Sequence, residues 1–220
     1  MVTQIPAANA NLAAALLGQQ KQIPGRKEFK MFSTLVSDKE RAYTGSELSP
    51  HFILSRFGVK GSAIIAFAGA CSVKTEHLVD WEDRLANDKI EAKKMVHFLG
   101  EFFGMSLKEG VLLQRLFMAS LAESLAQELG VKAVEWGLKR DGDDVFVKDR
   151  KLSVSIVTAS PVSVLLHAGI NIDPAGAPVP AIGLDELKVD YKPWVEAALQ
   201  RFQSEWESMD WACAKVRPVM

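Results

Sequence analysis

Residues 125–173, LAQELGVKAVEWGLKRDGDDVFVKDRKLSVSIVTASPVSVLLHAGINID, hold the pattern that decides the fold. An apolar helical stretch stops at Gly130 and is followed by short segments of alternating character. The segments expected next are a strand over 131–138, a polar loop over 139–142, a strand over 144–147 and a charged turn over 148–150. Two further strands follow, 151–156 and 166–172, so the stretch predicts a sheet.

A polar face runs along these last two strands, because side chains in a strand alternate between its two sides. In the first strand the polar side holds Lys151, Ser153 and Ser155; in the second it holds His167, Gly169 and Asn171. A lysine acts as a point charge for a carboxylate or phosphate, and glycine lets a ligand approach the backbone. The face therefore suits a small carboxylate or a nucleotide. The solvated side of an antiparallel sheet is the alternative, with equal weight.

The rest of the chain alternates between strand and helix signals. We expect strands over 32–36 and 62–67. We also expect one helix that begins at Ser49-Pro50 and three later helices over 88–103, 111–129 and 191–209. With no internal repeat, residues 31–220 predict one α+β domain whose mixed or antiparallel sheet is flanked by helices. Residues 1–30 are expected to be an extension, either disordered, not native, or carrying a short helix over 10–20.

The composition excludes several protein classes. The 26 basic and 27 acidic side chains leave a net charge of −1, so no global positive field attracts nucleic acid. Only Cys71 and Cys213 are present, which excludes a disulfide scaffold and every Cys-x-x-Cys motif. No apolar stretch reaches the roughly 20 residues that span a bilayer. We expect a cytoplasmic protein without a signal peptide, and Trp206 and Trp211 serve either the core or a homodimer interface.

Three other positions are candidates for chemistry or binding. Cys71 follows a buried strand and is either a nucleophile activated by His77 or His167, or an inert core thiol. Arg56, on the first predicted helix, either contacts an anionic ligand or lies at the surface. His97 sits among apolar residues and is expected to be a hydrogen-bonded core histidine.

An acidic group precedes the predicted helix over 88–103. His77, Asp80, Glu82 and Asp83 offer hard oxygen ligands that suit magnesium bound with a nucleotide, with Asp80 and Asp83 as the main ligands. The group matches no fixed ligand motif. A solvated helix start is the alternative.

Residues 125–173 resemble the corresponding part of lipoate and biotin protein ligases. In those enzymes a helix ending in Leu-Gly-Val leads to an Asp-containing strand, a turn, the signature Lys-Ile-Ser-Gly-Ser-Ala and a Gly-Ile-Asn-Val strand. The matching positions here are Asp144, Lys151, Ser153, Ser155, His167, Gly169 and Asn171. The lysine of that family contacts the acyl group and the adenylate phosphate, so the resemblance implies this role for Lys151.

Residues 31–220 as a whole resemble an uncharacterised family, domain of unknown function 366. Its recurring stretches appear here as YTGSEL at 43–48, VDWED at 79–83, RKLSVSI at 150–156 and KVRPV at 215–219. That family is understood to share the fold of class II aminoacyl-tRNA synthetase and biotin ligase catalytic domains. The resemblance therefore implies a ligase-like α+β fold.

One departure from the ligases concerns the loop ahead of this region. Lipoate ligases carry Arg-Arg-x-x-Gly-Gly-Gly and then His-Asp, and biotin ligases carry Gly-Arg-Gly-Arg. This chain has neither, and its residues 69–83, GACSVKTEHLVDWED, include one basic residue and several carboxylates. Ordinary lipoylation or biotinylation is therefore not expected.

Three functional hypotheses follow. The first is an enzyme that activates a small carboxylic acid with ATP and magnesium, with Lys151 stabilising negative charge. The second is an acyltransferase that uses Cys71. The third is a module in nucleotide or tRNA metabolism that binds a small ligand without turnover.

Overall fold

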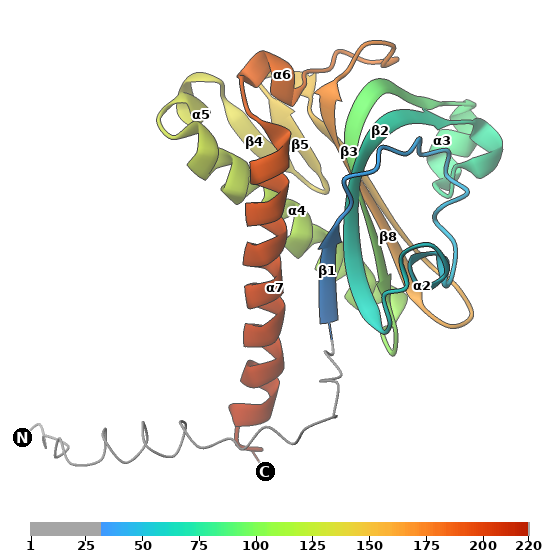
Figure 1. Cartoon of the computed structure of the whole chain (residues 1–220), viewed down its shortest axis with the longest axis vertical. Helices are drawn as coiled ribbons and strands as arrows, with labels where there is room; N and C mark the ends of the chain where they lie inside the picture. The colour runs from blue at the N-terminus through green and yellow to red at the C-terminus, as the bar shows by residue number, and fades with distance from the viewer. Residues whose placement is uncertain (1–31, 220) are drawn as a thin grey trace, which may run out of the picture. The chain divides into compact units, whose positions relative to one another are not determined.

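The main sheet places its longest strands in the centre. The computed structural model describes residues 32–219, and in this range five strands pair in the order β1 (Phe32–Val36), β2 (Ser62–Val73), β3 (Ile90–Phe102), β8 (Val164–Asp173) and β7 (Ser153–Ala159). The pair β1–β2 is parallel and the other neighbours are antiparallel. The predicted mixed sheet is thus confirmed (Figure 1). The predicted extension over 1–30 lies outside the described residues.

A second, smaller sheet holds the segment before β7. It pairs β4 (Leu138–Asp141), β5 (Asp144–Val147) and β6 (Arg150–Lys151), all antiparallel. The β4–β5 turn contains Gly142 at φ +62°, a conformation that glycine adopts without strain. The chain leaves this sheet at the buried Leu152 and enters the main sheet at Ser153.

Two long helices cover one face of the main sheet: α4 (Leu107–Leu129) and α7 (Tyr191–Lys215). A capping box starts α4, because the Ser106 hydroxyl accepts from the Glu109 N–H and the Glu109 carboxylate accepts from the Ser106 N–H. The shorter helical elements are α2 (Phe52–Phe57), η1 (Thr75–His77), α3 (Trp81–Ala86), α5 (Lys132–Glu135) and α6 (Leu184–Leu187). Within 32–219, no helix combines the length and apolarity needed to cross a membrane.

Apolar packing divides into two cores, one on each face of the main sheet. The larger core joins α4 and α7 to the sheet and centres on rings such as Phe98, Phe117 and Phe202. The smaller core lies on the opposite face, beside α2, and includes Tyr43, Phe67 and Met95. This second face is only partly covered, so it is where a ligand can reach the sheet.

The helix predicted over 88–103 is wrong, because these residues form β3. Eight consecutive residues from Met95 to Phe102 are buried, since β3 lies between β2 and β8 and both of its faces are covered. A doubly buried strand carries an apolar run rather than a clear alternation. Its largest apolar residues happen to recur at helical spacing, which is why the sequence predicted a helix here.

The strand predicted over 131–138 is also wrong. Residues 132–135 form α5, and β4 begins only at Leu138, so the predicted loop at 139–142 is partly strand. The helix expected from Ser49-Pro50 begins at Phe52, with His51 as its N-cap. The other predicted strands, 32–36 and 62–67, and the helices over 111–129 and 191–209 are confirmed, with longer bounds for all but the first.

A buried carboxylate ties α2 to the sheet. Glu101 of β3 is 2% exposed, and its Oε1 accepts from the His51 N–H at 2.8 Å and from the Ser163 hydroxyl at 2.8 Å. His51 is held in the left-handed region at φ 60°. The carboxylate therefore accepts two hydrogen bonds that join β3 to the start of α2 and to the residue before β8.

We expect Glu101→Ala to lower the free energy of unfolding by about 2–3 kcal/mol, because it removes a buried acceptor of two hydrogen bonds. Urea unfolding measures this change. Glu101→Gln keeps one acceptor oxygen and should cost less. Glu123→Ala, which breaks an exposed ion pair with Arg201, should stay within about 0.5 kcal/mol of the parent. An alanine variant as stable as the parent would contradict the role given to Glu101.

Candidate functional site

A cavity of about 420 Å³ opens on the partly covered face of the main sheet, next to the smaller sheet. Its apolar floor comes from the smaller core and β7, and its polar wall comes from β6, β8 and the 77–91 segment. The residues that line it include Tyr43, Asp80, Asp83, Asp88, Asp144, Lys151, Ser153, Val154, His167 and Asn171. An apolar floor with a few converging polar groups is typical of a small-molecule site.

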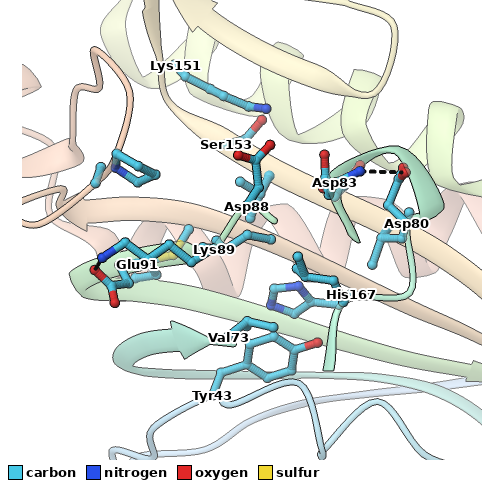
Figure 2. A pocket seen from close by; sticks show the side chains of 18 of the residues that line it. Tyr43, Val73, Asp80, Asp83, Asp88, Lys89, Glu91, Lys151, Ser153 and His167 are labelled. Carbon is cyan, nitrogen blue, oxygen red and sulfur yellow. Dashed lines mark hydrogen bonds and ion pairs between the residues drawn. The ribbon is translucent and has the colours of Figure 1, made fainter. Parts of the chain in front are cut away.

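Lys151 points into this cavity from β6 (Figure 2). Its Nζ lies 2.8 Å from Asp144 Oδ2, and its side chain is 32% exposed. Burial raises the pKa of Asp144, while the hydrogen bond and charge of Lys151 act in the opposite direction. An ammonium has three donors, and Asp144 takes one of them, so the others remain available to a ligand. The predicted pairing of Asp144 and Lys151 in one site is thus observed.

The predicted polar face over 151–156 is wrong in detail, because Leu152 separates two strands of different sheets. Ser153 Oγ accepts from the Val145 N–H at 2.7 Å. Ser155 Oγ accepts from Gln114 of α4 at 2.8 Å and donates to the Asp143 carbonyl at 3.0 Å. Both serines border the cavity, but their hydroxyls are bonded to the protein. Their main contribution is to join the two sheets.

The polar face of β8 is confirmed. His167 and Asn171 border the cavity, whereas their neighbours Ala168 and Ile170 face the larger core. Asn171 Nδ2 donates to the Lys151 carbonyl at 3.2 Å, so it positions the backbone of that lysine. Gly169 lies on the same face but is covered, because a Cβ there would meet Met95 and Val154. It does not border the cavity.

Two buried histidines and a tyrosine form the deepest part of the site. His97 Nε2 lies 3.3 Å from the Gly69 carbonyl, so it donates, and its Nδ1 then accepts from His167 Nε2 at 3.1 Å. The Tyr43 ring stacks on His167 with centroids 3.8 Å apart. This arrangement confirms His97 as a core histidine and leaves His167 Nδ1 as an acceptor without a partner among residues 32–219.

Burial keeps both imidazoles neutral. Desolvation lowers the pKa of His97 to about 4, and desolvation together with His97 lowers the pKa of His167 well below its ordinary value. In the unfolded chain each histidine takes up a proton below about pH 6.5. The unfolded state therefore binds more protons between pH 6.5 and 4, and the folded state loses stability as the pH falls.

Between pH 7.5 and 5.5 we expect the free energy of unfolding to fall by about 2–3 kcal/mol, roughly 1.4 kcal/mol for each histidine. Urea unfolding at several pH values measures this slope. His97→Gln removes one titrating group and should reduce the loss by about half. His77→Gln, at an exposed position, should leave the slope unchanged. A flat profile for the parent chain would show that the histidines are not buried in neutral form.

The carboxylates near the mouth of the cavity do not form a preformed metal centre. Asp80 is the N-cap of α3 and accepts from the N–H groups of Glu82 and Asp83. Within residues 32–219, no group of three or more His, Cys, Asp or Glu side chains is arranged to hold a metal ion. The magnesium predicted at Asp80 and Asp83 stays a prediction, and the described contacts of Asp80 give it the role of capping α3.

Cys71 and Arg56 lie apart from the cavity. Cys71 is 3% exposed, and burial, followed by the charges of Glu47 and Glu91, raises the pKa of its thiol to about 12. A thiol in this state is not a ready nucleophile. Arg56 is exposed on α2 and does not border the cavity. The structure therefore gives the Cys71 acyltransferase hypothesis no support.

Tyr43 and Asp88 border the cavity but were missed as site residues. Tyr43 starts the YTGSEL stretch. Its backbone runs beside β2, and its N–H donates to the Ala70 carbonyl of that strand at 2.8 Å. The only sequence signal for it was the family resemblance of that stretch. Asp88 lay inside the helix wrongly predicted over 88–103, so no pattern pointed to it.

Comparison with known proteins identifies relatives of this chain. The chain is 30% identical over 173 residues to an uncharacterised protein of Methanocaldococcus jannaschii, a match that covers 74% of this chain and 76% of that protein. It is 35% identical to a solved protein of unknown function from Pyrococcus horikoshi, with a TM-score of 0.79 over 86% of this chain and all of that one.

Two structures solved with lipoate or biotin share the fold at low identity. LipL1 of P. falciparum, solved with lipoate, matches with a TM-score of 0.51 and 10% identity over 86% of this chain and 64% of its own. A variant of the Aquifex aeolicus biotin protein ligase, solved with biotin, matches with a TM-score of 0.50 and 15% identity. This match covers 80% of this chain and 70% of the ligase chain. The family model described as Domain of unknown function (DUF366) matches residues 32–217, and the chain belongs to that family.

Proposed function

We propose that the cavity binds a small carboxylic acid and that the protein activates this acid with ATP. The observation that carries the proposal is Lys151, whose ammonium enters a cavity of about 420 Å³ above an apolar floor. Asp144 fixes the lysine through a 2.8 Å contact and Asn171 holds its backbone. A positioned cation beside an apolar surface suits an acid with an organic body.

In the proposed reaction, one carboxylate oxygen of the acid attacks the α-phosphorus of ATP. A phosphorus–oxygen bond forms to the acid, the bond from the α-phosphorus to the pyrophosphate oxygen breaks, and pyrophosphate leaves with that electron pair. Negative charge gathers on the phosphoryl oxygens during the attack. The remaining donors of Lys151 are the groups in this chain that stabilise it, an effect commonly worth a few kcal/mol.

Two structures of the same fold support this proposal through the ligands they were solved with. LipL1 and the Aquifex aeolicus ligase were solved with lipoate and with biotin, and both ligands are carboxylic acids with an apolar body. Among residues 32–219, Lys89 and Lys151 supply the basic side chains of the cavity, and Lys89 pairs with Glu91 at 2.8 Å. The chain also lacks the arginine-containing loops of the lipoate and biotin ligases. The acid is therefore not expected to be lipoate or biotin.

A two-step screen tests the proposal. Thermal-shift measurements with fatty acids, amino acids, lipoate and biotin should identify acids that stabilise the chain, since a ligand at 100 times its Kd contributes about 2.7 kcal/mol. ATP–pyrophosphate exchange should then depend on one of these acids. Stabilisation without exchange would support the second candidate, a module that binds the ligand without turnover.

That second candidate has one specific observation in its favour. The lining of the cavity holds six carboxylates and two lysines, a poor environment for the phosphates of a nucleotide. The exchange assay separates the two candidates, because both predict binding of the acid and only the first predicts incorporation of pyrophosphate into ATP. A chain that no acid stabilises would contradict both.

A further inference from the structure

Two carboxylates of the cavity have neither a cationic partner nor a side-chain hydrogen bond in the part of the chain that the structure describes. Asp144 pairs with Lys151, Glu91 pairs with Lys89, and Asp143 lies 3.4 Å from Arg115. Asp83 and Asp88 have no ion pair and no side-chain hydrogen bond, although the Asp88 N–H donates to the Asp83 carbonyl at 2.9 Å. Both carboxylates can therefore accept hydrogen bonds from a bound cation.

The charge of this pair is not balanced by its surroundings. Burial raises the pKa of Asp83, and the charges of Asp80 and Asp88 raise it further, whereas Lys151 acts in the opposite direction. Asp83 is partly buried at the cavity wall, and Asp88 stands at the more exposed mouth. A cation placed between these carboxylates would relieve their mutual repulsion.

Two polar side chains with little exposure also border this cavity without a described hydrogen-bond partner. Tyr43 is 3% exposed, borders the cavity, and its hydroxyl has no hydrogen-bond partner within residues 32–219. His167 is also 3% exposed, and its Nδ1 is likewise without a described partner. Polar groups with little exposure are normally satisfied, so the Tyr43 hydroxyl and His167 Nδ1 offer a donor and an acceptor to polar atoms of a ligand.

We propose that the acid bound here is zwitterionic, with its carboxylate at Lys151 and an ammonium or guanidinium group at Asp83 and Asp88. Figure 2 shows the side chains of Lys151, Asp83 and Asp88 directed into the same part of the cavity. An organic cation fits better than a bare metal ion, because Asp80 is occupied by α3 and the adjoining floor is apolar. This inference rests on the proposed function and names its class of substrate.

Calorimetric titration with paired ligands tests the inference. The probes are ω-amino acids from glycine to 8-aminooctanoate, each compared with the fatty acid in which a methyl group replaces the ammonium. The proteins are the parent chain, Asp83→Asn/Asp88→Asn, and the control Glu82→Gln, an exposed neighbour that does not border the cavity. The parent and the control should bind the best amino acid about 10-fold tighter than its methyl partner.

In the double variant this preference should fall below about 2-fold, while the fatty acid keeps its affinity. A parent chain without the preference, or a double variant that retains it, would overturn the inference. The proposed function would then still hold for carboxylic acids without a cationic group. Magnesium chloride that stabilises the parent but not the double variant would assign the carboxylates to a metal and also overturn it. Failure of both ligand series to bind would remove the proposed function as well.

Discussion

Lys151→Ala is expected to lower kcat/KM for acid-dependent pyrophosphate exchange by about 100- to 1,000-fold, the usual effect of removing one group that stabilises transition-state charge. The lysine enters the cavity and is fixed by Asp144, a carboxylate of the smaller sheet. Its loss removes the donors offered to the phosphoryl oxygens. The pyrophosphate assay with the acid found by thermal shift measures the effect.

Three matched variants separate charge from folding. Lys151→Met keeps most of the side-chain volume and should lose as much activity as the alanine variant. Lys151→Ala/Asp144→Asn also removes the carboxylate that would be left unpaired, so it should unfold normally and remain inactive. Lys132→Ala, at an exposed position on α5, should behave as the parent. An active Lys151→Met protein would exclude a role for the charge.

Gly69→Ala is expected to lower the free energy of unfolding by about 3 kcal/mol or more, because overpacking against backbone cannot be relieved by rotating a side chain. A Cβ at this position of β2 would overlap the carbonyl oxygen of Arg41. Residues 41–43 run beside β2 here, with the Arg41 N–H donating to the Ala68 carbonyl at 2.9 Å. Displacing this segment also displaces Tyr43 from the cavity floor, so ligand binding should weaken too.

Gly58→Ala provides the control for this substitution. Gly58 ends α2 at φ +69°, and a Cβ there meets nothing within 4 Å. Its alanine variant pays only the backbone strain of the left-handed region, about 1–2 kcal/mol. Urea unfolding of both variants measures the difference. Equal losses would show that residues 41–43 do not pack on β2 as described.

Much of the fold was predictable where one face of an element is buried and the other is not. The alternation of β8 placed His167 and Asn171 correctly, because a change of register by one residue would bury them with the larger core. The long helices α4 and α7 followed from apolar residues at helical spacing. Strand β3 was not predictable in this way, because both of its faces are covered and the alternation is lost.

The candidate site was predictable only in part. Lys151 was found from the strand alternation and from the ligase resemblance, and Asp144 from the resemblance alone, which depends on a turn and two short strands that stay close in sequence. Ser153 and Ser155 were assigned to the wrong surroundings, because the change of sheet at Leu152 has no local signal. Tyr43 and Asp88 reach the cavity only through tertiary packing, which a pattern along the chain cannot reveal.

A crystal structure of the chain with the acid that stabilises it most tests the role of Lys151 directly. We expect a carboxylate oxygen within hydrogen-bond distance of Lys151 Nζ, with the body of the acid on the floor formed by Tyr43 and Val154. An acid bound elsewhere, or bound in this cavity with its carboxylate away from Lys151, would contradict the binding role proposed for Lys151.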